Sequence, residues 1–103
     1  MAGLLNLLNN QGAASGTDIT GDWFTWTGGP GDFWVWGNLG GGTISLQAAI
    51  DTTAPVTICG TETTAVTTTS SAVDVFHLNH GTQIRAVLTG TTSTSSGVYV
   101  KVN

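Results

Sequence analysis

Residues 40–50 read GGGTISLQAAI, a run in which apolar and polar side chains alternate after three glycines. Three apolar residues, Ile44, Leu46 and Ala48, alternate with the polar residues Ser45 and Gln47. A period of two is typical of a β-strand that buries one face and exposes the other. We therefore expect a half-buried strand over Thr43–Ile50, entered through a glycine-rich turn.

Similar short runs, rich in β-branched and aromatic residues, follow one another along the chain and are separated by Gly, Pro, Asp and Asn. None of the connections holds a helical pattern long enough for a crossover, which favours antiparallel pairing. The pattern predicts an all-β fold, an antiparallel β-sandwich or jelly-roll-like barrel of about seven or eight short strands. Besides Thr43–Ile50, the expected strands are Trp23–Thr27, Phe33–Trp36, Val56–Cys59, an edge strand around Ala65–Thr68, Val73–His77, Gln83–Leu88 and Val98–Val102.

The first two expected strands are rich in aromatic residues and flank a turn cluster, Gly28–Asp32. They are expected to form a β-hairpin with rings on both faces, because neighbouring side chains of a strand point in opposite directions. A sandwich covers only one face of each sheet, so Trp23, Trp26, Trp34 and Trp36 are candidate partner-interface residues. An internal cluster made with the N-terminal leucines is the alternative.

Carbohydrate binding is a second functional interpretation of this aromatic hairpin. Sugars stack on tryptophan rings, and the neighbouring Asp22 and Asp32 can accept hydrogen bonds from hydroxyl groups. Rings in strands belong to a core or a protein interface far more often than to a ligand site. Association with protein is therefore the preferred interpretation.

The N-terminal segment carries four leucines within eight residues, and the linker that follows is rich in Gly and Ala. The spacing predicts one or two turns of amphipathic helix over Gly3–Asn10, which is too short to be stable alone. We expect an arm and flexible joint over residues 1–21 and a sandwich over residues 22–103. The arm would dock on its own domain or on a partner, or would be a frayed end. Its candidate interface residues are Leu4, Leu5, Leu7 and Leu8.

Only 8% of the residues are charged, and two basic residues stand against six acidic ones. Nucleic-acid binding and attachment to anionic membranes both need clusters of Lys and Arg, so neither is expected. A surface with so few charges has little repulsion to keep copies apart, which favours assembly. The single cysteine, Cys59, is expected to be a buried apolar side chain and suits synthesis in a reducing cytoplasm.

No motif for catalysis, cofactor binding or metal binding stands out, and the protein is not expected to be an enzyme. His77 and His80 have a spacing that chelates metals on a helix, but here they span a strand end and a turn. The acidic residues are scattered and do not form a calcium loop. Ser, His and Asp occur without a nucleophile motif or a basic residue suited to an oxyanion.

Three stretches, Gly42–Gln47, Gly81–Gly90 and Val98–Val102, together resemble small β-sandwich structural proteins of tailed-bacteriophage virions. The resemblance covers about residues 33–102, although the aromatic hairpin is heavier here and the turn at Asp51 lacks the usual Gly and Trp. It implies a capsid decoration (cement) protein, or a tail or fibre component, made in the host cytoplasm and located in the virion. It also implies a homotrimer that binds the major capsid protein or tail subunits. A glycan-binding module on a phage head or tail appendage is the alternative function.

Overall fold

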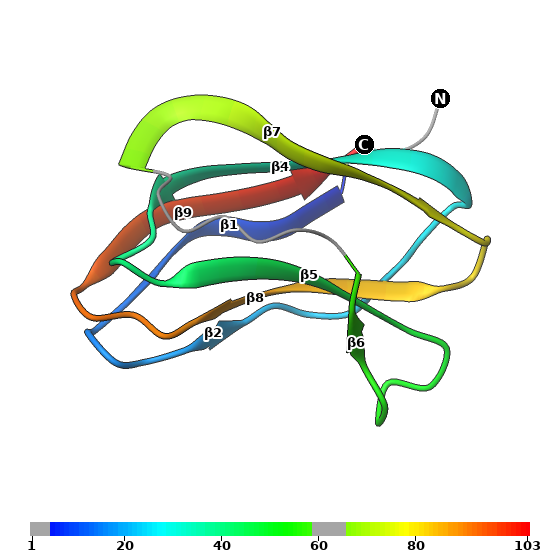
Figure 1. The fold of residues 1–103 in the computed structure, drawn as a ribbon, viewed down its shortest axis with the longest axis horizontal. Helices are drawn as coiled ribbons and strands as arrows, with labels where there is room; N and C mark the ends of the chain where they lie inside the picture. The colour runs from blue at the N-terminus through cyan, green and yellow to red at the C-terminus, as the bar shows by residue number, and fades with distance from the viewer. Residues whose placement is uncertain (1–4, 59–65) are drawn as a thin grey trace.

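The computed structural model describes residues 5–58 and 66–103, and within them the chain forms two antiparallel β-sheets packed face to face (Figure 1). The four-stranded sheet has the order β1-β9-β4-β7. The five-stranded sheet has the order β2-β8-β5-β6, and β3 also pairs with β8. The strands are β1 (Leu5–Ala13), β2 (Ile19–Thr20), β3 (Phe24–Thr25), β4 (Gly29–Asn38), β5 (Thr43–Ala49), β6 (Val56–Thr57), β7 (Val66–Leu78), β8 (Gln83–Thr89) and β9 (Ser95–Val102).

The predicted all-β antiparallel sandwich is confirmed, and the clearest alternating runs form its central strands. In β5, Ile44 and Leu46 are buried, and in β8 Ile84 and Leu88 are buried. These strands pair along their whole length, from Thr43 opposite Thr89 to Ala49 opposite Gln83. The period of two therefore identified both the strands and their inner faces.

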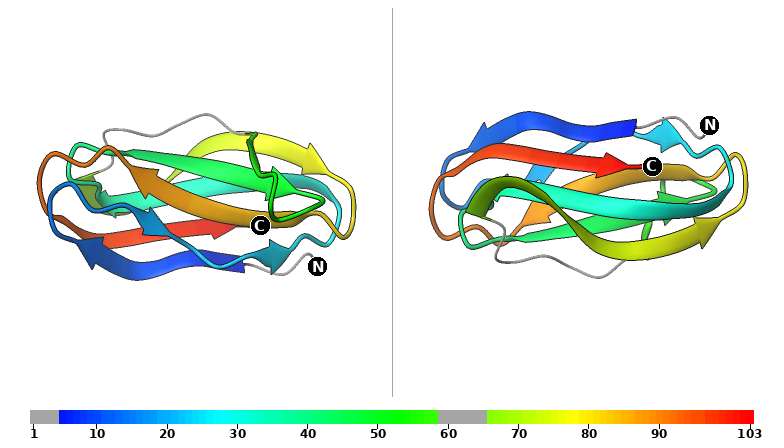
Figure 2. Two further views of the ribbon diagram at one scale, coloured as in Figure 1. Left: turned by 90° about the horizontal axis from the view of Figure 1, so that it is seen from below. Right: turned by 90° about the horizontal axis from the view of Figure 1, so that it is seen from above.

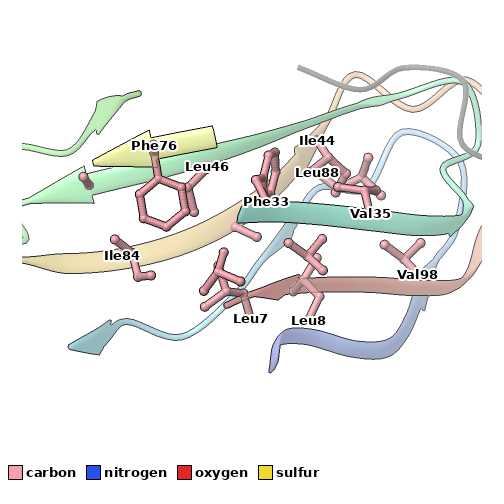
Figure 3. Close-up of a cluster of buried hydrophobic side chains, with 14 of the residues drawn as sticks. Leu7, Leu8, Phe33, Val35, Ile44, Leu46, Phe76, Ile84, Leu88 and Val98 are labelled. Carbon is pink, nitrogen blue, oxygen red and sulfur yellow. The ribbon is translucent and has the colours of Figure 1, made fainter. Parts of the chain in front are cut away.

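The hydrophobic core lies between the two sheets, where side chains from both inner faces meet (Figure 3). Its apolar residues come from nearly every strand, which makes one continuous cluster. The largest side chains with almost no exposed surface are Trp26, Phe33, Leu39, Ile44, Leu46, Ile84 and Leu88. The four-stranded sheet also contributes three buried valines of β9 to this core, which are Val98, Val100 and Val102.

The predicted aromatic hairpin is wrong, because its two arms belong to different sheets. Strand β3 pairs with β8, whereas β4 pairs with β7 and β9. The chain passes from one sheet to the other at Gly28 and Gly29, whose φ angles are 99° and 84°. These left-handed conformations suit glycine, and they turn the chain across the sandwich instead of back along itself.

Trp26 lies at this crossing and is fully enclosed, with 0% of its surface exposed. Its indole Nε1 donates to the carbonyl oxygen of Gly29 at 3.1 Å, and its ring centroid is 4.9 Å from that of Phe76. A Cβ on Gly31 would lie 2.6 Å from the Phe76 ring and 2.7 Å from the Trp26 ring. Gly31 is therefore needed to leave room for both rings.

The predicted N-terminal helix is also wrong, because Leu5–Ala13 forms strand β1 against β9. The register shifts between Asn6 and Leu8, which lets the consecutive Leu7 and Leu8 both point into the core with 3% exposure. Backbone pairing with β9 satisfies the polar groups that a short isolated helix leaves to water. The leucines thus dock on their own domain, while Leu4 lies outside the described residues.

The chain after β5 also differs in detail from the predicted strands. Strand β6 is only Val56–Thr57, and Cys59 lies outside the described residues. The two runs expected around Ala65–Thr68 and Val73–His77 fall on one long strand, β7, whose described part begins at Val66. Near its end Phe76 points into the core, so its neighbours Val75 and His77 face outward.

Replacing Leu8 by Ala tests whether β1 is part of the core. We expect the free energy of unfolding to fall by about 2–5 kcal/mol, because the change removes buried methyl groups and leaves a cavity. Denaturant unfolding followed by tryptophan fluorescence measures the change. Asn9→Ala, at the exposed next position, is the control and should change stability by less than about 0.5 kcal/mol. Equal effects of the two substitutions would contradict the placement of β1.

Candidate interaction surfaces

The outer side of the four-stranded sheet carries four large side chains on its two central strands. Trp34 of β4 is opposite Lys101 of β9, and Trp36 is opposite Tyr99. Phe33 and Val35, which alternate with the tryptophans, are buried in the core. We call Trp34, Trp36, Tyr99 and Lys101 the aromatic face. The view onto this sheet shows β1, β9, β4 and β7 side by side, with the beginning of β7 curling over the end of β4 (Figure 2, right).

Three of the four side chains of the aromatic face, those of Trp36, Tyr99 and Lys101, contact one another. The rings of Trp36 and Tyr99 are stacked, with centroids 4.9 Å apart and planes inclined by only 8°. The Lys101 Nζ lies 5.4 Å from the centroid of the Trp36 ring, within the range of a cation–π interaction. These contacts fix the rings and leave all four side chains only partly buried. The face is a preorganised mixture of apolar surface and one positive charge.

A second tryptophan–cation pair lies on the outer side of the five-stranded sheet. The guanidinium carbon of Arg85 is 4.4 Å from the centroid of the Trp23 ring, and Arg85 Nε donates to Gln47 Oε1 at 2.8 Å. Both basic residues of the chain therefore lie against tryptophan rings, on opposite sides of the sandwich. Arg85 already donates a hydrogen bond within its own sheet, so fewer of its N–H groups are free to bind a partner. This pair is therefore a weaker candidate for binding than the aromatic face.

The structure places the interface residues expected from the sequence at different depths in the sandwich. Leu7, Leu8 and Trp26 are in the core, so they have no surface with which to meet a partner. Leu5 is partly buried against the core. Trp23, Trp34 and Trp36 are at the surface but on different sheets, so they do not form one site.

The most exposed large apolar residues were not predicted from the sequence. Ile50 is 97% exposed, Val75 is 70% exposed and Val56 is 62% exposed. The sequence predicts Ile50 as the last residue of the strand Thr43–Ile50, but β5 ends one residue earlier, at Ala49. The sequence signal for its exposure is its position directly before the turn at Asp51. A residue at the end of a strand need not follow the alternation of buried and exposed side chains.

Ile50 and Val56 border an open groove of about 690 Å³ between the β5–β6 connection and the end of β7. Its wall is mostly apolar, with Ala54, Ile58 and Leu78 among the lining residues. At the rim, the backbone N–H and the hydroxyl of Thr53 both donate to Asp51 Oδ1, at 3.0 and 2.8 Å. These hydrogen bonds lower the pKa of the exposed Asp51 carboxyl, as in many turns that begin with aspartate.

The histidines do not form a metal centre in the described part of the chain. His77 and His80 are both exposed, and no group of three potential metal-ligating side chains occurs among residues 5–58 and 66–103. In the same ranges no helix has the length and apolar character needed to span a membrane.

Comparisons of this chain with protein-family models, curated proteins and solved structures find no match.

A double-mutant cycle on Trp36→Ala and Tyr99→Ala tests the preorganised aromatic face. Stacked rings contribute about 0.5–1.5 kcal/mol beyond their buried area, so we expect a coupling energy in that range from chemical denaturation. Trp23 and Tyr99 lie on opposite sides of the sandwich, and the same cycle on that pair is the control, with coupling below about 0.5 kcal/mol. No coupling between Trp36 and Tyr99 would show that the stack does not form in solution.

Proposed function

We propose that this protein is a structural subunit of a virion, a capsid decoration (cement) protein, that binds other capsid or tail subunits and stabilises the particle. The observation that carries the proposal is the aromatic face, because Trp34, Trp36 and Tyr99 are partly exposed on the outer side of a rigid sheet. The resemblance of the strand motifs to phage virion proteins is the reason for proposing a location in the virion. The outer side of the four-stranded sheet supplies the surface for contact with another protein.

Tryptophan and tyrosine are the residues that most often dominate the energy of protein interfaces. Burying them removes a large apolar area from water, and their few rotatable bonds keep the entropy loss small. Here the loss is smaller still, because Trp36 is already held by Tyr99 and Lys101. The exposed Val75 on β7 adds apolar surface to the same side of the sheet.

The low charge of the chain fits a subunit that stays in contact with neighbours. Only 8% of the residues are charged, so few ions have to be dehydrated when a surface is covered. In a particle, each copy would make the same contacts with its neighbours. Modest contacts repeated in this way retain a subunit through multivalency and do not require one very strong site.

The carbohydrate reading of the tryptophans is less well supported by the geometry. The expected aromatic hairpin does not exist, and Trp26 is enclosed in the core. One side of the Trp36 ring is stacked on Tyr99, and Lys101 approaches the same ring. A sugar needs an open ring face, so these contacts favour a protein partner over a glycan at this surface.

The test is incorporation into particles of the phage that encodes the chain, measured by quantitative mass spectrometry of purified virions. Replacing Trp34 and Trp36 together by Ala should lower incorporation on the order of ten-fold, because two anchor side chains are lost. The variant should keep the circular dichroism of a β-protein, since both rings lie outside the core.

Trp23→Ala is the matched control, because it removes a partly buried tryptophan from the opposite sheet. It should incorporate like the wild type. Full incorporation of the Trp34/Trp36 variant would refute the role of the aromatic face. Absence of the wild-type chain from purified particles would refute the virion function itself.

A further inference from the structure

The open groove beside β6 exposes apolar side chains that belong, by strand register, to the inner face of a sheet. Val56 of β6 is the cross-strand partner of Ala48, which is buried in the core. Two residues later, Ile58 donates its backbone N–H to the carbonyl oxygen of Leu46 at 3.0 Å, and Leu46 is also buried. Cross-strand partners lie on the same face of a sheet, so Val56 is on the core side. It is nevertheless 62% exposed.

This exposure follows from the position of β6 at the end of its sheet. Strand β6 is the last strand of the five-stranded sheet, and β7 is the last strand of the four-stranded sheet. Figure 1 shows β6 and the connection before it extending away from the four-stranded sheet. The inner side of β6 is therefore left uncovered and forms one wall of the groove. Ile58 and Leu78, which line it, also pack against the core, so the groove is an open continuation of the core.

Ile50 projects beside this groove and is 97% exposed. The turn that follows it is held by hydrogen bonds, because the carbonyl oxygen of Asp51 accepts from the N–H of Ala54 at 2.9 Å and its carboxyl group accepts from Thr53. A single exposed aliphatic residue is common on protein surfaces. Here, however, it stands next to an apolar groove and on a turn that needs little further ordering to make a contact.

A projecting apolar side chain next to an apolar groove is the arrangement that a contact between two identical copies requires. In a two-fold dimer the same patch of both copies forms the contact, so the patch must be complementary to itself. A two-fold axis running along the groove, between Ile50 and the groove floor, places Ile50 of each copy in the groove of the other. The groove has a volume of about 690 Å³ and can hold an isoleucine side chain.

The charges around the groove permit this pairing. Asp51 and His77 are the only ionisable residues among the described residues that line it, and they come from its two opposite walls. The same axis brings the wall that carries Asp51 in one copy toward the wall that carries His77 in the other. Two Asp51 carboxylates therefore do not have to meet, and no unpaired like charges are buried by the contact.

We propose that two copies of this chain form a two-fold dimer through this groove, with Ile50 of each copy seated in the groove of the other. The contact covers Ile50 and Val56, apolar surface that the fold leaves in water. It lies at the edge of the sandwich, apart from the aromatic face, and does not depend on the proposed virion function. A two-fold contact closes at two copies, whereas the resemblance to virion proteins implies a trimer.

The experiment is analytical ultracentrifugation of the full chain from micromolar to millimolar concentration. The wild type should pass reversibly from the monomer mass of 10.5 kDa to twice that mass. Ile50→Ser should raise the dissociation constant of the dimer by a factor of about ten or more, because each copy loses an isoleucine side chain that the contact buries. The variant should keep the circular dichroism of the wild type, since Ile50 does not belong to the core.

Val75→Ser is the matched control, because it shortens an aliphatic side chain that is 70% exposed but does not line the groove. It should dimerise like the wild type. A second measurement locates the contact by ¹⁵N NMR of the full chain at increasing concentration. The backbone amide shifts that change with concentration should be concentrated in residues 48–58 and 77–82.

The proposal is overturned if the chain is a monomer or a trimer over the whole range, if the shifts concentrate on the aromatic face, or if Ile50→Ser dimerises like the wild type. The Trp34/Trp36 double variant should dimerise normally in the same experiment, because both rings lie on the outer side of the four-stranded sheet. Loss of the dimer and loss of virion incorporation are therefore measured separately, so failure of this proposal is distinguishable from failure of the proposed function.

Discussion

Apolar contact between the inner faces of the two sheets is the interaction on which the rest of this structure depends. Phe33 and Val35 of β4 and Val98, Val100 and Val102 of β9 have no exposed surface. Because side chains alternate, a shift of β4 by one residue would bring Trp34 and Trp36 inward and expose Phe33 and Val35. The larger indoles would not fit the space that these residues fill. Core packing thus determines that the stacked Trp36 and Tyr99 face outward.

The same core explains the unusual first strand. Two consecutive leucines cannot both face inward in a regular strand, yet Leu7 and Leu8 are both buried. The register shifts of β1 against β9 make this possible, because a bulge changes the side of the sheet to which the following side chains point. The irregular path of β1 therefore follows from the burial of apolar side chains.

Sequence patterns predicted the parts of the fold that depend on local alternation, and they failed where pairing depends on distant residues. The inner residues of β5, β8 and β9 follow from a period of two. The partner of Phe24–Thr25 does not, because its pairing with β8 joins residues about 60 positions apart. The chain changes sheets at Gly28 and Gly29, which both have positive φ angles. The spacing of the N-terminal leucines fits a helix or a bulged strand, and β9 decides between them. The contact between Trp36 and Tyr99 on the aromatic face could not be predicted, since it depends on the register of β4 against β9.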